Sequence, residues 1–283
     1  MKQKRIAAIH DISCVGRCSL TVALPILSAA GIDTGILPTA VLSTHTGGFE
    51  NFTYRDLTED ITPIASHWKS LDLKFDALYS GFLGSYEQIG LVSDLFELFK
   101  EQDTLILVDP VMADNGEFYS VYSPEMAKGM AKLCQKADII VPNLTEAAFM
   151  LDEPYRGENY DENYVKELLK RLSDLGAQKI VLTGISYEPD RLGAACFDSK
   201  TGEYSYVHNE KISDHFHGTG DVFGSSLLAA LLNGFDLNQA TQIAVNYTRE
   251  AIIKTLLYDQ ERRYGVCFEK AIPFLLKQLK LAE

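Results

Sequence analysis

The sequence predicts an α/β fold in which helices flank a mostly parallel, doubly wound sheet and a small antiparallel hairpin precedes the last helices. Two observations predict this class. Apolar runs such as LILV and IIV lack polar alternation, which is typical of strands buried on both faces of a parallel sheet. Amphipathic stretches separate these runs, so that strand and helix alternate over residues 5–185.

Each element follows from its own pattern. Strands are expected at the apolar runs 5–12, 35–43, 77–83, 104–112, 138–143 and 179–185. Helices are expected between them, at 19–30, 57–69, 86–101, 124–135, 145–151 and 161–175. The hairpin is expected at 192–198 and 204–210, around the turn sequence SKTG, and closing helices at 219–233, 237–256 and 266–281. No linker or repeat interrupts the pattern, so residues 1–283 are expected to form a single domain.

Composition restricts the classes of function. The chain has 39 Asp and Glu against 26 Lys and Arg, a net charge of −13, which argues against a nucleic-acid-binding surface. No apolar run approaches the ~20 residues that span a membrane, and the first residues lack the apolar core of a signal peptide. The five cysteines are odd in number and scattered, which favours reduced thiols and a cytoplasmic location.

Small polar residues and carboxylates follow nearly every predicted parallel strand. Ligands of open α/β sheets bind at the carboxyl ends of the strands, so this edge is expected to be the rim of an active site. The candidates there are Asp11, Ser13, Thr46, Phe82, Asp109, Asp114, Asn143, Glu146, Thr183 and Gly184. The histidines near the same edge could orient a substrate, although polar loop residues are the default interpretation; these are His10, His45, His215 and His217.

The segment GTGD, residues 218–221, puts two glycines and a carboxylate at the start of a predicted helix. Gly218, Thr219 and Gly220 can point several backbone N–H groups in one direction, and the helix dipole adds to their attraction for an anion. Asp221 has two interpretations, a helix N-cap or a catalytic base. A carboxylate beside an anion site suits phosphoryl transfer to an alcohol, because the carboxylate accepts the hydroxyl proton.

The same chemistry requires Mg²⁺, which proteins usually hold through one or two carboxylates and several waters. Asp109, Asp114 and Glu146 are the candidates at neighbouring strand ends. Two of them have structural alternatives: Asp109 could fix a turn before Pro110, and Glu146 could cap the helix at 145–151.

The sequence excludes two other types of phosphate-binding loop. A Walker loop needs a Gly-Lys-Ser/Thr ending, which the chain lacks. A dinucleotide loop needs GxGxxG after a buried strand, whereas the spacing of Gly218, Gly220 and Gly224 is one residue too long.

Several motifs together resemble the ribokinase-like superfamily, and within it the vitamin B6 (pyridoxal) kinase family. They are STHTGG (43–48), YSGFLGS (79–85), DPVMAD (109–114), PNLTEA (142–147), LTG (182–184) and GTGDVF (218–223). The resemblance covers essentially the whole chain. It implies ATP-dependent phosphorylation of the 5′-hydroxymethyl group of pyridoxal, pyridoxine or pyridoxamine with Mg²⁺. It also implies a homodimer, and activation by a monovalent cation such as K⁺.

By motif position, the resemblance implies a role for each candidate. Asp221 is expected to be the catalytic base. The residues around the transferring phosphate would be Gly218, Thr219 and Gly220. The residues on the metal and nucleotide side would be Asp114, Asn143, Glu146, Thr183 and Gly184, with Asp114 and Glu146 near the metal. The residues that hold or stack the ring would be Asp11, Ser13, Thr46 and Phe82. The hairpin would lie near the adenine.

The chain departs from the B6 kinase pattern at two places. Ala113 stands where the family usually has glycine, and HDISCVGRCS, with its Asp-x-Ser, resembles hydroxymethylpyrimidine kinases, so either Asp11 or Ser13 could meet the ring. Hydroxymethylpyrimidine (phosphate) kinase of thiamine synthesis is therefore the main alternative, although those relatives commonly have GTGC instead of GTGD. A sugar kinase would need an early Gly-Asn motif, which is not visible. A non-catalytic ligand-binding regulator would not need Asp221 and Glu146.

Overall fold

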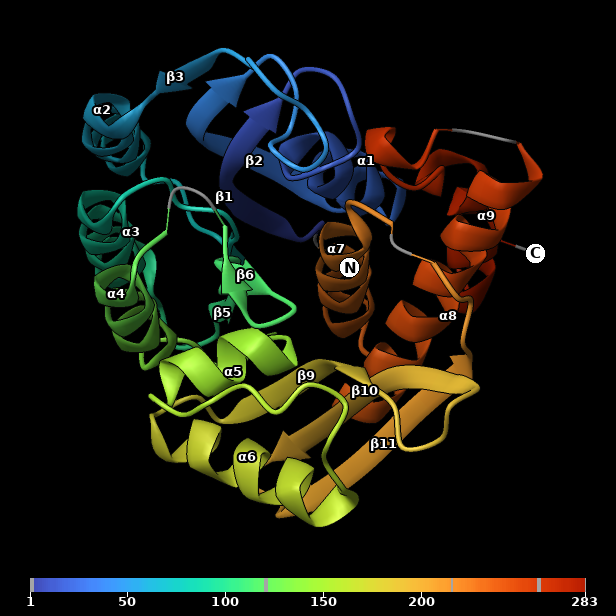
Figure 1. Cartoon of the computed structure of the whole chain (residues 1–283). Coiled ribbons are helices and arrows are strands. Elements are labelled where there is room, and N and C mark those ends of the chain that lie inside the picture. The colour runs from blue at the N-terminus through green and yellow to red at the C-terminus, as the bar shows by residue number, and fades with distance from the viewer. Residues whose placement is uncertain (1–2, 120–121, 215, 259–260, 283) are drawn as a thin grey trace.

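A nine-stranded sheet runs through the computed structural model, which describes residues 3–119, 122–214, 216–258 and 261–282 (Figure 1). Its parallel strands are β1 (Arg5–Ser13), β2 (Asp33–Leu42), β4 (Ala77–Ser80), β5 (Leu105–Val108), β8 (Ile139–Ile140) and β9 (Lys179–Ile185). Three antiparallel strands complete it: β3 (Tyr54–Asp56), β10 (Arg191–Asp198) and β11 (Glu203–Glu210). The order β11-β10-β9-β8-β5-β4-β1-β2-β3 confirms the predicted mostly parallel sheet with its hairpin.

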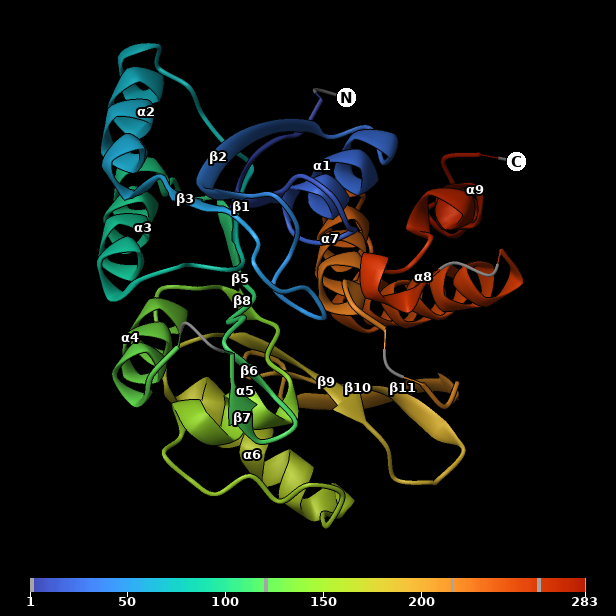
Figure 2. The same ribbon diagram turned by 45° about the horizontal axis from the view of Figure 1, so that its top comes forward.

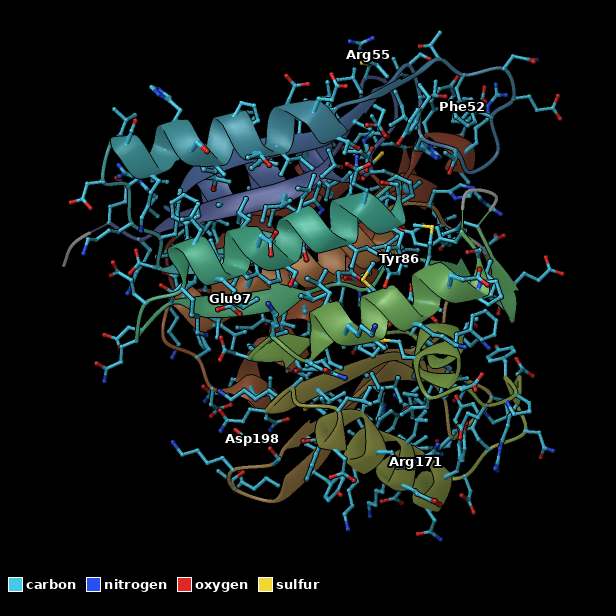
Figure 3. The ribbon with its side chains drawn as sticks, turned by 90° about the vertical axis from the view of Figure 1, so that its left-hand side faces the viewer. Phe52, Arg55, Tyr86, Glu97, Arg171 and Asp198 are labelled. Carbon is cyan, nitrogen blue, oxygen red and sulfur yellow. The ribbon has the colours of Figure 1, made fainter. Side chains whose placement is uncertain are left out.

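Helices cover both faces of the sheet (Figures 1 and 2). One face carries α2 (Thr58–Ser70), α3 (Tyr86–Phe99), α4 (Pro124–Cys134), α5 (Leu144–Met150) and α6 (Glu162–Asp174). Figure 3 looks onto this face, with α2, α3 and α4 side by side over the strands and α6 beyond them. The other face carries α1 (Leu20–Ala29), α7 (Thr219–Leu232), α8 (Leu237–Leu257) and α9 (Phe268–Gln278).

The parallel strands feed two separate hydrophobic cores, one on each face. In β1, Ala7 and Ile9 point into the core under α2–α6, whereas Ile6 points into the core under α1 and α7–α9. In β4, Leu78 points into the core under α2–α6 and Tyr79 into the core under α1 and α7–α9. Successive strand residues face opposite sides, so burial on both sides explains the apolar runs without alternation.

Differences from the sequence prediction concentrate where strands meet the site. The strand expected over 104–112 ends at Val108, and the strand expected over 138–143 shrinks to Ile139–Ile140. The residues that follow belong to no strand, although Asn143 and Thr183 still form an isolated parallel bridge. Four short elements were missed because two or three residues carry no periodicity: β3, β6 (Ala113–Asp114), β7 (Glu117–Phe118) and the 3-10 turn η1 (Arg262–Tyr264).

The nine-stranded sheet passes through elements from β1 to β11 without a break in pairing. The expectation that residues 1–283 form one domain is compatible with that continuity, and the boundary itself stays a prediction. Within the described part of the chain, no helix combines the length and the apolar character needed to cross a membrane.

Candidate active site

A cavity of about 560 Å³ opens at the carboxyl ends of the parallel strands, beside the start of α7. It brings together every candidate site residue that the sequence indicated. These are Asp11, Ser13, Thr46, Phe82, Asp109, Asp114, Asn143, Glu146, Thr183, Gly184, Gly218, Thr219, Gly220 and Asp221. The edge predicted to be an active-site rim therefore encloses one cavity.

The GTG turn is held in a conformation that only glycine adopts easily. Gly218 is the N-cap of α7 and has φ 75°, in the left-handed region. A Cβ atom at this position would lie 1.9 Å from the carbonyl oxygen of Arg17, so a side chain has no room there. The hydroxyl of Thr219 donates to the carbonyl of Phe216 at 3.3 Å. The turn thus presents the N-terminus of a fourteen-residue helix to the cavity, which is a favourable place for a phosphate.

Asp221 lies in the first turn of α7 and is not the N-cap, so the capping interpretation was wrong. Its carboxylate accepts a hydrogen bond from the backbone N–H of Ser19, which also lines the cavity. Burial raises the pKa of Asp221 to about 7, against the opposing effect of the Ser19 N–H, and the neighbouring Asp11 adds to the rise. A carboxyl that titrates near neutrality suits a general base.

Asp11 is buried next to that base and accepts from two hydroxyls. Ser19 Oγ donates to Oδ1 at 2.5 Å, and Ser13 Oγ donates to Oδ2 at 3.2 Å. Ser19 holds this position with φ 56° and ψ −131°, a region that side-chain-bearing residues rarely occupy. Its hydroxyl meets Asp11 and its N–H meets Asp221, so a single strained residue joins the two carboxylates. Both Asp11 and Ser13 line the cavity, and the choice between them as the ring contact stays open.

Asn143 and Glu146 form a reciprocal capping box at the start of α5. Asn143 Oδ1 accepts from the Glu146 N–H at 2.9 Å, and Glu146 Oε2 accepts from the Asn143 N–H at 2.8 Å. Glu146 Oε1 also accepts from the N–H of Met112 at 3.1 Å, and Asn143 Nδ2 donates to the carbonyl of Ala113 at 2.8 Å. The helix-capping interpretation of Glu146 is correct, and the same contacts attach α5 to the segment after β5.

Two buried carboxylates, Asp109 and Glu146, lie close enough beside this box for their charges to interact. Burial raises the pKa of Asp109 well above its usual value, and the charge of Glu146 adds to the rise. Burial likewise raises the pKa of Glu146, although backbone N–H groups oppose it. Asp114 is exposed at the cavity wall, and both its oxygens accept from Asn115, the backbone N–H at 2.9 Å and Nδ2 at 3.1 Å. A cation between these carboxylates would relieve the cost of burying like charges.

The carboxylates suit Mg²⁺ in the way that proteins usually bind it. In the described residues, no three Asp, Glu, His or Cys side chains are grouped as a complete metal cage. Mg²⁺ commonly keeps several waters and takes only one or two carboxylates, so Asp109 and Glu146, with Asp114 nearby, fit that pattern.

One end of the cavity is formed by β9 and by the hairpin strands β10 and β11. Thr183 donates its N–H to the carbonyl of Pro142 at 2.9 Å, and Gly184 has φ 75° at the exposed rim. The sequence indicated the hairpin itself but not the wall that α8 contributes. The α8 residues at this wall are Val245, Thr248, Arg249 and Ile252. Their spacing of three to four residues places them on one face of a helix, which was the only signal available beforehand.

The other end holds the aromatic and histidine side chains. The ring of Phe82 lines the cavity and packs edge-on against Tyr122 at 5.7 Å. His45 and His217 lie in loops, as predicted, and both line the cavity. His10 instead lies buried behind it, edge-on to Tyr79 at 4.4 Å, where burial lowers its pKa to about 3. His215 lies outside the described residues.

A family model described as phosphomethylpyrimidine kinase matches residues 35–264, most of the chain. The chain belongs to this family. This family member is an ATP-dependent kinase, and the predicted ribokinase-like fold and kinship with B6 kinases are confirmed.

Three relatives illustrate the range of the family. A Bacteroides thetaiotaomicron protein named as a candidate phosphomethylpyrimidine kinase, crystallised with pyridoxal, is 40% identical with a TM-score of 0.93, over 97% of this chain and 96% of that one. Pyridoxal kinase from Lactobacillus plantarum is 29% identical with a TM-score of 0.89, over 98% of each chain. Hydroxymethylpyrimidine/phosphomethylpyrimidine kinase from Bacillus subtilis is 26% identical over 79% of this chain and 78% of its own.

Proposed function

We propose that this kinase transfers the γ-phosphoryl group of ATP to the 5′-hydroxymethyl group of pyridoxal, pyridoxine or pyridoxamine. The observation that carries the proposal is the position of Asp221, which lies in the first turn of α7, beside the Gly218–Gly220 anion site, and lines the cavity. A phosphate on the backbone N–H groups and an alcohol at the carboxylate would be neighbours there.

Asp221 would act as the general base. As the alcohol oxygen forms its bond to the γ-phosphorus, the bond from that phosphorus to the bridging oxygen of ADP breaks, and the hydroxyl proton passes to the Asp221 carboxylate. The Ser19 N–H holds that carboxylate in place, and the N-terminus of α7 offsets the negative charge of the moving phosphoryl group. Mg²⁺, held near Asp109, Asp114 and Glu146, would neutralise the ATP oxygens.

Three features support a B6 vitamer as the alcohol. The chain has GTGD, with aspartate where hydroxymethylpyrimidine kinases commonly have cysteine. The Bacteroides relative was crystallised with pyridoxal, and the Lactobacillus relative is a pyridoxal kinase. Phe82, at the wall of the cavity, offers a ring face for an aromatic heterocycle.

Hydroxymethylpyrimidine is the second candidate. The matched family carries the phosphomethylpyrimidine name, a Bacillus subtilis relative acts on that pyrimidine, and the Asp11-x-Ser13 motif resembles those kinases. Activation by K⁺, assembly as a homodimer and a cytoplasmic location stay predictions.

ATP consumption with pyridoxal, pyridoxine, pyridoxamine and hydroxymethylpyrimidine, measured side by side, tests the proposal. We expect kcat/KM to be highest for one of the three B6 vitamers. A higher kcat/KM for hydroxymethylpyrimidine would replace the proposal with the second candidate.

A further inference from the structure

His45 lies at the meeting point of segments that are distant in the sequence. The side chain is only 6% exposed. A Cβ atom at Gly16 would lie 2.4 Å from its ring, which shows how closely the loop after β1 packs on it. On its other sides, its ring centroid lies 5.0 Å from that of Phe49 and 5.2 Å from that of His217. The segments after β2 and ahead of α7 are close together in Figures 1 and 2.

Both ring nitrogens of His45 are engaged by backbone groups. Nε2 lies 2.6 Å from the carbonyl oxygen of Arg263, and the N–H of Gly47 donates to Nδ1 at 3.2 Å. A carbonyl can only accept and a backbone N–H can only donate, so these contacts require a proton on Nε2 and none on Nδ1. We call this pair of bonds the His45 bridge.

The His45 bridge determines where Thr46 lies. Thr46 stands between His45 and Gly47, the two residues that the bridge closes into a turn, and it lines the cavity. The Arg263 carbonyl belongs to η1. In the same turn, the carbonyl of Tyr264 accepts a hydrogen bond from the N–H of Arg17 at 2.9 Å. The His45 bridge therefore anchors the Thr46 turn to a segment 218 residues away.

We propose that His45 is a positioning residue for the alcohol substrate, whose neutral Nε2–H form holds the Thr46 turn against η1 and whose protonation releases it. The inference rests on the proposed function in that it assigns the Thr46 side of the cavity to the alcohol. A cationic ring would place a second N–H against the N–H of Gly47, so the cation and the closed turn exclude each other.

The surroundings favour the neutral ring. Burial lowers the pKa of His45, nearby His217 adds to the fall, and the Arg263 carbonyl opposes it. The segments that pack near His45 also carry charged side chains, most of them in ion pairs. Arg263 pairs with Glu261, Arg17 with Glu269, and Arg262 with Asp214, while Glu50 follows on the His45 loop. The bridge is therefore present at neutral pH and is lost as the pH falls through the lowered pKa, below 6.5.

The first test needs no substrate. Nitrogen-15 NMR of the full chain distinguishes a protonated ring nitrogen from a bare one and follows the Gly47 amide through an acid titration. We expect the proton on Nε2 near pH 7.5, and a shift of the Gly47 amide that coincides with protonation of His45. A proton on Nδ1, or a Gly47 amide that ignores the titration, would overturn the proposal whatever the alcohol is.

The second test separates the two substrates. His45→Phe keeps a ring but removes both bonds, so KM for the alcohol should rise on the order of tenfold while KM for ATP stays within about twofold. His45→Gln offers an amide N–H to the Arg263 carbonyl and should restore part of the loss. His67→Gln, on exposed α2, is the matched control and should change neither constant.

Both constants are measured with pyridoxal and with hydroxymethylpyrimidine. A rise with whichever alcohol is turned over supports the proposal, even if that alcohol is the pyrimidine and the proposed function fails. An unchanged alcohol KM in His45→Phe, or equal rises for alcohol and ATP, would overturn it.

Discussion

Asn143 and Glu146 cap each other, and each also holds the segment that follows β5. The side chain of Asn143 accepts from the Glu146 N–H, the side chain of Glu146 accepts from the Asn143 N–H, and their remaining polar atoms reach Ala113 and Met112. The Asn143–Glu146 motif, which was expected to organise a metal, thus also connects the segment after β8 to the segment after β5. The carboxylates Asp109 and Asp114 stand on either side of Met112 and Ala113 in the sequence and line the cavity.

Replacing Glu146 should therefore affect stability and metal use together. Glu146→Gln puts an amide NH₂ where a carboxylate oxygen accepts backbone N–H groups, so we expect the free energy of unfolding to fall by about 1–3 kcal/mol. The Mg²⁺ concentration for half-maximal activity should rise, because one buried negative charge is lost. Urea denaturation and a Mg²⁺ titration measure the two effects.

Glu162→Gln is the control for this change, since Glu162 makes an exposed pair with Lys166 on α6. Such pairs contribute only a few tenths of a kcal/mol. Equal destabilisation by the two variants would remove the special role of Glu146.

Removing the charge of Asp221 should slow the chemical step with little effect on nucleotide binding. We expect Asp221→Asn to lower kcat by roughly 10²–10⁴-fold, the usual contribution of a general base. The affinity for ATP, measured by equilibrium titration, should be nearly unchanged, because the anion site consists of backbone N–H groups. Turnover near that of the unmodified enzyme would show that another group takes the proton.

The raised pKa of Asp221 predicts opposite pH effects on activity and on stability. The base is active only when ionised, so kcat/KM should rise with pH through about 7. Burial disfavours the charged form in the folded state, so the stabilising contribution of this group is complete below the unfolded pKa of about 3.9 and is lost as the pH rises through about 7.

The stability half of this prediction can be measured by thermal unfolding. At pH 8, Asp221→Asn should melt at a higher temperature than the unmodified protein, and near pH 4 the difference should shrink. A variant that is less stable at both pH values would contradict the assignment of burial as the cause of the raised pKa.

Two neighbouring glycines of the anion turn should respond differently to alanine. Gly218→Ala forces a side chain into a left-handed conformation and against the Arg17 carbonyl, so we expect destabilisation and loss of activity. Gly220 lies inside the first turn of α7, and apart from its chain neighbours and the backbone of its own helix nothing lies within 4 Å of an added Cβ, so Gly220→Ala should fold with unchanged or higher stability. Thermal unfolding of both variants makes the comparison, and equal destabilisation would contradict it.

Much of the fold and most of the site followed from local pattern. Unalternated apolar runs identified the parallel strands, and the polar residues at their ends met at one cavity because parallel strands end at the same edge of a sheet. That geometric rule requires no knowledge of individual contacts. The GTGD turn was likewise readable from the sequence, because glycine and helix polarity act within a few residues.

The tertiary structure decided what each of those residues does. The sequence allows Asp221 to be a helix cap, whereas in the structure Gly218 is the cap; the raised pKa of Asp221 depends on burial by segments that the sequence does not place beside it. Ser19 joins Asp11 to Asp221 through an unusual backbone conformation, and His45 meets Arg263 across 218 residues. The periodicity of the sequence does not predict such contacts. Strand ends and turns are properties of short segments, whereas desolvation, tautomer choice and carboxylate pairing arise only when distant segments pack together.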